Sequence, residues 1–284
     1  MKPAPFTYHV PASVDEAVAL LSRWGPQDGR ILAGGQSLIP TMAFRVARPA
    51  HLIDINGIGE LARLAVTDGV LSIGACVRHA AFESDGVQGP TGALLRKVVR
   101  NIAHYPIRTR GTFCGSIAHA DPASEWCCVM AGLDGTVVLR SSRGVRRLNA
   151  HEFFHGVMAT ALEEDELVIA AELPLLAEGT RTGFQEFSRR KGDFAIAMAL
   201  VCYRLANGVM VEPRVAIGGA EAQARRIPQA EQVLRGRASG ADVFGEAGAA
   251  AAAAIDPLED INNTAAYRRG LVRTLVERAL ESAQ

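Results

Sequence analysis

Two short segments rich in glycine and in hydroxyl side chains are the parts of this sequence best suited to chemistry. The first, Ala33-Gly34-Gly35-Gln36-Ser37-Leu38, follows an apolar stretch at Arg30–Ala33 that is typical of a short strand. Two adjacent glycines let the backbone turn sharply and bring N–H groups close to an anion. Gln36 and Ser37 add side-chain donors for phosphate oxygens. The segment indicates an anion-binding loop, with an ordinary Gly-Gly turn as the alternative.

The second segment, Arg110-Gly111-Thr112-Phe113-Cys114-Gly115-Ser116, has the same chemical character. Glycines stand at both of its ends, and Thr112 and Ser116 supply hydroxyl groups. It has neither the GxGxxG spacing of a Rossmann dinucleotide site nor the GKS/T ending of a P-loop. Two separate loops of this kind would suit the two ends of a diphosphate, so the pair favours a dinucleotide more than either loop does alone.

Composition excludes several other classes of function. Lys+Arg and Asp+Glu number 30 each, which argues against a nucleic-acid surface because such a surface needs a basic excess. The five cysteines form no CxxC pair and no metal-ligand spacing, so we predict no metal site built by this chain alone. His151 and His155 are four residues apart, but Glu152 between them does not follow the HExxH arrangement.

The sequence gives no sign of membrane insertion or secretion. No apolar run reaches the roughly 20 residues that a membrane-spanning helix needs. The first residues, Met1-Lys2-Pro3-Ala4-Pro5, lack the apolar core of a signal peptide. We therefore expect a cytoplasmic protein.

Periodicity and turn signals predict alternating strands and helices that place the two glycine segments. Ser13 is a good N-cap for a helix over Val14–Trp24, and Thr67-Asp68-Gly69 joins a hairpin. Asp121 is expected to cap a helix that starts at Pro122 and ends at Gly132. Other expected helices are Gly92–Ile102, Ala222–Leu234, Ala247–Ala254 and Asn263–Ala283, the last with Tyr267, Leu271, Leu275 and Ala279 on its packing face. The expected strands include Phe6–Val10, His51–Ile55, Leu61–Val66, Val70–Ile73, Val137–Arg140, Val145–Leu148, Leu167–Leu173 and Val209–Gly218, and Gly183–Ser188 is a further apolar stretch.

Several of these stretches together resemble the FAD-binding subunit of molybdenum hydroxylases, most closely the medium subunit of carbon monoxide dehydrogenase-type enzymes, with a related domain in xanthine dehydrogenases. The likeness covers nearly the whole chain. It is carried by the first segment continued through Ile39-Pro40, by Arg45–Pro49, by His51–Ile55, by Arg108–Ala123, by Phe184–Ala195, and by the helix around Ala266–Arg269.

The resemblance implies an α+β fold of the vanillyl-alcohol-oxidase type. The FAD-binding domain would consist of two α/β pieces, residues 1–57 and 58–176, followed by a C-terminal sheet-and-helix domain at 177–284. FAD would lie extended between the first two pieces, with its diphosphate wrapped by both glycine segments. The cofactor-binding residues implied in this way are Ala33, Gly34, Gly35, Gln36, Ser37, Leu38, Gly111, Thr112, Cys114, Gly115 and Ser116, with Glu125 near the adenosine ribose, Leu167 near the adenine and Ile107 against the isoalloxazine ring.

The resemblance also implies partners. The family is assembled from a large molybdopterin subunit, a small subunit with two [2Fe-2S] clusters and this FAD subunit, usually doubled into a dimer of heterotrimers. Electrons would pass from substrate through molybdenum and the clusters to FAD, and then to an external acceptor. The chemistry belongs to the cofactor, so no catalytic acid or base is expected on this chain.

Two positions depart from the family pattern. The family usually has Gly-Gly where this chain has Cys114-Gly115, so a side chain stands where the backbone approaches the phosphate. The family often has a lysine beside the flavin near Gln185 or Glu186, and neither residue is basic.

Two other functions remain open at this stage. The first is a self-contained flavin oxidase of related fold, which would need a substrate cap and acid–base residues beside the flavin. The second is a scaffold subunit that has lost FAD, which the intact glycines at 34, 35, 111 and 115 disfavour. The sequence names neither the substrate of the complex nor its electron acceptor.

Overall fold

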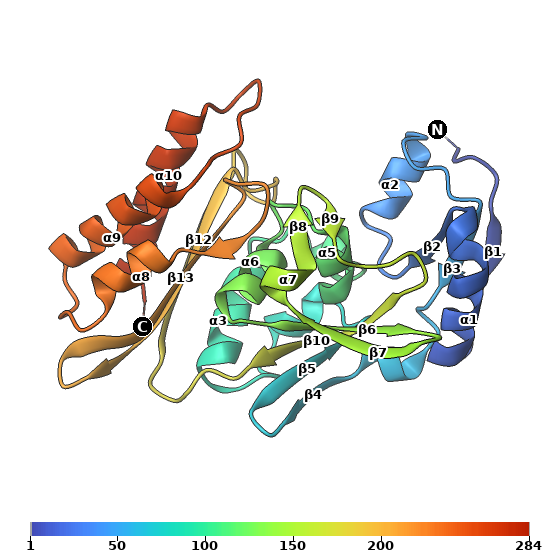
Figure 1. Cartoon of the computed structure of the whole chain (residues 1–284), viewed down its shortest axis with the longest axis horizontal. Coiled ribbons are helices and arrows are strands. Elements are labelled where there is room, and N and C mark those ends of the chain that lie inside the picture. The colour runs from blue at the N-terminus through green and yellow to red at the C-terminus, as the bar shows by residue number, and fades with distance from the viewer. Residues whose placement is uncertain (1, 284) are drawn as a thin grey trace.

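The computed structural model describes residues 2–283, and they form three sheet-centred units arranged in a row along the long axis (Figure 1). The first unit carries a parallel sheet with strand order β1-β3-β2. Helix α1 packs against this sheet and α2 follows β2 directly. The bounds are β1 Thr7–His9, α1 Val14–Trp24, β2 Gly29–Leu32, α2 Leu38–Ala43 and β3 His51–Asp54.

The local signals explain α1 well. The Ser13 hydroxyl accepts a hydrogen bond from the Glu16 N–H, and Ala17, Val18 and Leu21 are buried at helical spacing. The expected cap and the expected bounds of this helix are confirmed.

The second unit is built on a five-stranded antiparallel sheet of order β4-β5-β10-β6-β7. Asp68 and Gly69 both have positive φ, which fits the tight β4–β5 hairpin predicted there. Its strands are β4 Leu64–Thr67, β5 Val70–Gly74, β6 Thr136–Ser141, β7 Gly144–Asn149 and β10 Leu167–Pro174, and a small ribbon joins β8 Phe154–Gly156 to β9 Ala159–Thr160. Its helices are α3 Gly89–Val99, α4 Tyr105–Arg108, α5 Phe113–His119, α6 Glu125–Gly132 and α7 Ala150–Phe153, with the 3-10 turns η2 Gly59–Ala62 and η3 His79–Glu83.

The third unit has an antiparallel sheet of order β11-β12-β13-β14 whose outer face is covered by three helices. Figure 1 shows these helices at one end of the molecule, with α6 and α3 against the opposite face of the sheet. The bounds are β11 Arg181–Phe187, β12 Ala197–Ala206, β13 Val209–Gly218, β14 Arg225–Arg226, α8 Pro228–Leu234, α9 Ala241–Ala254 and α10 Ala265–Glu281. No helix within residues 2–283 is long and apolar enough to cross a membrane.

Alternating side chains of the third sheet pack into two separate hydrophobic cores, one on each face of the sheet. Phe184, Met198 and Leu200 join the large core shared with the second unit. Ala197, Val201 and Val215 join a second core beneath α8, α9 and α10. Because neighbouring residues of a strand point to opposite faces, the central strands are buried on both sides.

Several predicted boundaries are wrong for identifiable reasons. The helix predicted from Pro122 begins at Glu125, because Asp121 Oδ1 accepts the Ala123 N–H in a turn and Ser124 takes the N-cap position. The helix predicted over Ala222–Leu234 begins at Pro228, because Arg225 and Arg226 pair with β13 as a strand. The packing face of α10 is also shifted, since Arg268, Val272 and Val276 are buried whereas Tyr267 is 44% exposed.

Candidate functional site

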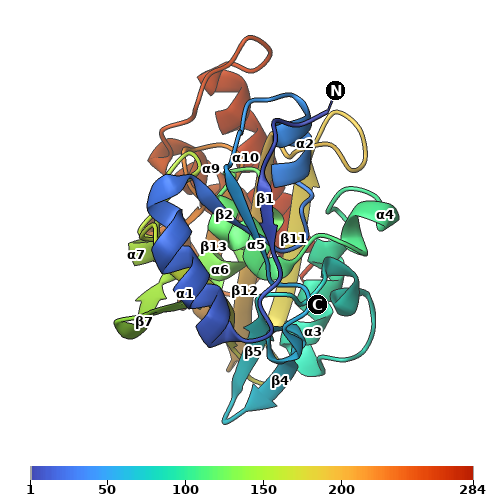
Figure 2. The ribbon, with the colours of Figure 1, turned by 90° about the vertical axis from the view of Figure 1, so that its right-hand side faces the viewer.

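A cavity of about 580 Å³ lies where the first unit meets the second, and both glycine segments line it. One wall is the turn between β2 and α2, and the other is the start of α5. Figure 2 looks onto this side of the molecule, with β2 and α2 of the first unit near α5 of the second. Twelve of the fourteen residues expected at the cofactor line the cavity: Ala33, Gly34, Gly35, Gln36, Ser37, Leu38, Gly111, Thr112, Cys114, Gly115, Ser116 and Leu167.

The first wall is a turn with free backbone donors. Gly35 has φ +71°, a left-handed conformation that favours glycine, and its carbonyl accepts the Ile39 N–H as α2 begins. Within the described part of the chain, the N–H groups of Gly34, Gly35, Gln36 and Ser37 donate to no protein acceptor. Consecutive free N–H groups of this kind form a concavity that suits an anion.

The second wall is the N-terminal turn of a short helix, where an open loop was expected. Thr112 is the N-cap of α5, and its hydroxyl accepts the Gly115 N–H at 3.0 Å. Phe113 donates its N–H to the Val77 carbonyl, which ties this turn to the strand connection beside it. Thr112 and Phe113 are almost fully buried, so this wall is part of the core.

The two walls touch through backbone atoms. A Cβ atom added to Gly34 would lie 2.5 Å from the Arg110 carbonyl oxygen and 2.7 Å from the Gly111 Cα atom. A Cβ added to Gly111 would lie 2.5 Å from His79 Nε2. Neither position has room for a side chain, so glycine is required for the walls to approach each other.

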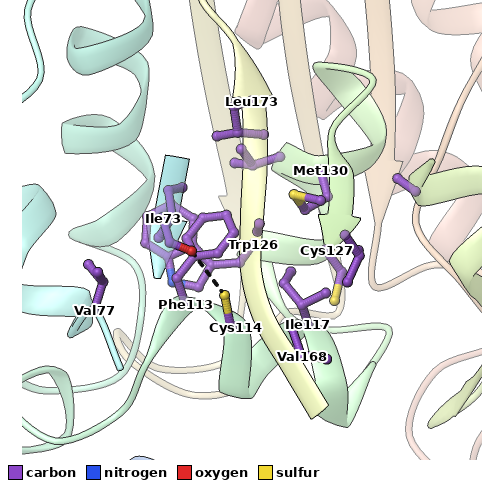
Figure 3. Close-up of a cluster of buried hydrophobic side chains, with 14 of the residues drawn as sticks. Ile73, Val77, Phe113, Cys114, Ile117, Trp126, Cys127, Met130, Val168 and Leu173 are labelled. Atoms are coloured by element: carbon purple, nitrogen blue, oxygen red, sulfur yellow. Dashed lines mark hydrogen bonds between the residues drawn. The ribbon is translucent and has the colours of Figure 1, made fainter. Parts of the chain in front are cut away.

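The side chain of Cys114 points into the core (Figure 3), where its Sγ lies 3.4 Å from the Ile73 carbonyl oxygen. Its exposed fraction is 2%, and burial raises the pKa of its thiol far above the ordinary value. Because the Cys114 side chain points inward, it does not cover the side of this helix turn that faces the cavity. Backbone atoms form that side, as they would with the glycine that the family usually has here.

Behind the second wall, an aromatic cluster holds it in place. Trp126 stacks obliquely on Phe113 with ring centroids 4.8 Å apart, and its indole N–H donates to His79 Nδ1 at 2.9 Å. Burial and the nearby charges of Arg108 and Arg78 lower the pKa of His79 to about 4, so this imidazole is neutral near neutral pH. His79 also lines the cavity. The structure gives this imidazole a buried, structural place at the site.

Two expected residues lie outside the cavity lining. Ile107, in α4, is 37% exposed. Glu125 begins α6, and burial together with the charge of Glu186 raises the pKa of its carboxyl. The cavity also has lining residues that the sequence did not single out, among them Met158, Glu163 and Glu166. They belong to loops distant in sequence, so no local pattern could have found them.

The comparisons with known proteins agree with this geometry. Residues 4–176 match the family described as the FAD binding domain in molybdopterin dehydrogenase, and residues 182–283 match the carbon monoxide dehydrogenase flavoprotein C-terminal domain. The chain therefore belongs to the FAD-binding medium subunits of the molybdenum hydroxylase family.

Individual relatives cover the chain from end to end. The nicotine 6-hydroxylase medium subunit of Paenarthrobacter nicotinovorans is 36% identical over 100% of this chain and 99% of its own length. The carbon monoxide dehydrogenase medium chain of Hydrogenophaga pseudoflava is 35% identical over 100% and 98%. A solved structure of carbon monoxide dehydrogenase from the same organism superposes with a TM-score of 0.95 at 37% identity, covering 100% of this chain and 98% of that one. The recognition and the fold class drawn from the sequence are confirmed.

Proposed function

We propose that this chain holds FAD in the cavity between its first two units and transfers electrons from partner iron–sulfur clusters to an external acceptor. The observation that carries the cofactor placement is a run of four backbone N–H groups, at Gly34, Gly35, Gln36 and Ser37, that donate to no acceptor within residues 2–283. This turn lines the cavity opposite a wall that glycines keep close. When bound, FAD supplies the redox chemistry, while the protein supplies position and electrostatics.

Different lining residues would contact different parts of FAD. The Gly34–Ser37 turn would donate backbone hydrogen bonds to one end of the diphosphate, and the Thr112–Ser116 turn would contact the other. Ala33, Leu38 and Leu167 add apolar lining, and Leu167 would contact the adenine. Glu125 and Ile107 lie outside the cavity lining. Where FAD extends beyond the cavity, Glu125 would contact the adenosine ribose and Ile107 would pack against the isoalloxazine ring. We place the boundaries of the three units near residues 57 and 176.

We further propose that the partners are a large molybdopterin subunit and a small subunit with two [2Fe-2S] clusters, joined as a dimer of heterotrimers in the cytoplasm. The support is the medium-subunit name that relatives such as nicotine 6-hydroxylase carry. Purification through a tag on this chain from its native host should yield FAD, molybdenum and iron together. A complex with flavin but no iron or molybdenum would contradict the assignment of partners.

The cofactor is tested by the visible spectrum of the purified chain, followed by identification of any flavin released on heating. We expect FAD, and a double variant, Gly35→Val with Gly115→Val, should retain none. A matched control is Gly57→Val with Gly240→Val, since a Cβ at either glycine meets no atom within 4 Å. Stoichiometric flavin in the Gly35/Gly115 variant would show that the wall assignment is wrong. A wild-type chain that refuses FAD would favour the scaffold.

A further inference from the structure

Two side chains outside the cavity lining are hydrogen-bonded to the backbone of both walls. Asn56 follows β3 in the connection from the first unit to the second, and Arg78 lies between β5 and η3 in the second unit. Neither residue lines the cavity. Their hydrogen bonds end on the two backbone segments that bring the walls together.

Asn56 is held at the end of β3 and reaches across to the end of β2. The Ile55 N–H continues the parallel pairing of these strands by donating to the Leu32 carbonyl at 3.1 Å. The Asn56 side chain then donates from Nδ2 to the Ala33 carbonyl at 2.8 Å and to Asp54 Oδ1 at 2.6 Å. The amide is therefore fixed against the residue that immediately precedes the first wall.

This hydrogen bond sets the direction of the first free donor in that wall. The Ala33 carbonyl and the Gly34 N–H belong to one peptide group, and no peptide bond among the described residues is cis. In a planar trans peptide the C=O and N–H groups point in opposite directions. Because Asn56 binds the carbonyl from a position outside the lining, the Gly34 N–H is directed away from Asn56, at a residue that does line the cavity.

Arg78 connects the same amide to the second wall. Its Nη2 donates to Asn56 Oδ1 at 2.5 Å, and its Nη1 donates to the Arg110 carbonyl. That carbonyl oxygen is the atom nearest to a Cβ added to Gly34, so the guanidinium binds where the two walls touch. The donors of a planar guanidinium have a fixed spacing, and Arg78 therefore holds the Asn56 amide at a fixed spacing from the Arg110 carbonyl.

The backbone of Arg78 is itself paired with the second wall. Arg78 and Thr112 face each other in an isolated antiparallel bridge, and the neighbouring His79 N–H donates to the Gly111 carbonyl at 3.0 Å. The base of the Arg78 side chain is therefore anchored to the second wall, and its guanidinium extends from there to the first unit.

The chemistry of the contacts allows only one orientation of the Asn56 amide. A guanidinium only donates, whereas carbonyl and carboxylate oxygens only accept. Oδ1 must therefore face Arg78, and Nδ2 must face Ala33 and Asp54. The Asp54 carboxylate is held in turn by the Tyr8 hydroxyl, which donates to it from β1. Because every polar atom of the amide has a partner, the arrangement is specific to asparagine.

We propose that Asn56 and Arg78 form a clamp that positions the two walls for the FAD diphosphate. Asn56 orients the Gly34 N–H, and Arg78 fixes the first wall at its spacing from the second. The inference rests on the proposed function, because a diphosphate is the ligand to which the first wall would donate. Both side chains act through the backbone of the walls, so they are positioning residues.

The first test is FAD binding by the full chain, measured as a dissociation constant in a flavin fluorescence titration. Asn56→Ala removes the bond to the Ala33 carbonyl, and Arg78→Lys keeps the positive charge without the planar fork. Each change should weaken FAD binding about tenfold, as expected for a lost hydrogen bond. Asn262→Ala and Arg63→Lys, at exposed positions, are the matched controls and should bind FAD as wild type does. Wild-type affinity in both clamp variants would overturn the proposal.

The double variant distinguishes one connected clamp from two separate contributions. Because the two side chains act through one link, Asn56→Ala combined with Arg78→Lys should bind FAD about as weakly as the weaker single variant. Losses that multiply to about a hundredfold would mean that the residues act independently, and would contradict the clamp. Urea unfolding of the same variants shows that each is folded under the conditions of the titration.

Hydrogen exchange of the FAD-free chain gives a readout that does not depend on the cofactor. Loss of the clamp should speed exchange of the Ile39 N–H, which donates to the Gly35 carbonyl in the first wall. The Ile227 N–H, which donates to the Val215 carbonyl in the third unit, should exchange as in wild type. A general loss of stability would instead speed both.

The exchange result also separates the clamp from the proposed function. Unchanged exchange at Ile39 in both Asn56→Ala and Arg78→Lys would overturn the clamp, whatever the FAD content of the chain. A wild-type chain that takes up no FAD would contradict the proposed function, and exchange at Ile39 would still decide whether Asn56 and Arg78 hold the first wall.

Discussion

The two walls of the cavity carry similar residues and are built on different principles. The first wall is a partly exposed turn at Gly34–Ser37 whose backbone donors are free, and it depends on one left-handed glycine. The second, at Thr112–Ser116, begins a helix whose cap, inward cysteine and aromatic backing tie it into the core. A wall of the first kind can donate to a ligand, whereas a wall of the second kind fixes where the ligand must lie. Changes in the first wall should therefore affect FAD most, and changes in the second should affect folding as well.

The largest effect is expected where the walls touch. Gly34→Val would drive a side chain into the Arg110 carbonyl and the Gly111 Cα atom, forcing the walls apart. We expect FAD retention to be lost, with a stability cost of about 1–3 kcal/mol for overpacking. The flavin-to-protein ratio and urea unfolding measure both, with Gly57→Val as control. Retention of FAD by Gly34→Val would show that the contact between the walls is dispensable.

Acidification should act on the second wall through His79. The imidazole titrates at about 4 in the folded chain against an ordinary value of 6.5. The unfolded chain therefore takes up this proton first, and stability present above pH 6.5 is lost as pH falls toward 4. The loss attributable to His79 is about 3 kcal/mol at the acidic end.

Carboxyl groups titrate in the same pH range, so the effect of His79 is measured as the difference in unfolding free energy between wild type and a His79 variant at each pH. His79→Leu should be less stable than wild type at pH 7.5, because the Trp126 N–H loses its acceptor. That deficit should shrink or reverse near pH 4.5, since the variant has no buried imidazole to protonate. The same change at the exposed His151 should have almost no effect at either pH. A deficit that stays constant with pH would argue against a buried neutral His79.

Replacing Cys114 by glycine restores the usual family residue and should separate folding from cofactor binding. The change removes a buried side chain and places glycine inside α5, so we expect a loss of about 1–2 kcal/mol. FAD retention should be unchanged, because the thiol faces the core. Tighter FAD binding in Cys114→Gly would mean that the side chain crowds the phosphate after all.

The smallest effects are expected at two helix caps, Thr112 at the start of α5 in the second wall and Ser13 at the start of α1 outside the cavity. Thr112→Ala and Ser13→Ala each remove a hydroxyl that accepts an N–H at the start of a helix, and each should cost about 1 kcal/mol. Thr112 lines the cavity, so its replacement should also weaken FAD binding, whereas the replacement of Ser13 should not. Unfolding curves and flavin titration of the two variants distinguish these outcomes. Equal flavin affinity in both would remove Thr112 from the proposed site.

Elements with strong local signals were predictable from the sequence. The α1 cap, the Asp68-Gly69 hairpin and the glycine-rich order of the first wall follow from a few adjacent residues. Boundaries failed where a distant strand or a side-chain turn competed with the local pattern, as at Asp121 and at Arg225–Arg226. Met158 and Glu166 line the cavity from loops that are far from the two glycine segments in sequence, so only the fold brings them to the site.

By itself, the sequence determined the two glycine segments, which favour a diphosphate because glycine allows closely spaced backbone donors. The family, with FAD as its cofactor, followed from the resemblance of several stretches of the chain to known FAD-binding subunits. The tertiary structure alone decided which way side chains face. It turned Cys114 into the core and placed neutral His79 behind the second wall. Those outcomes depend on burial and on contacts between residues up to 47 positions apart, and a linear pattern contains neither.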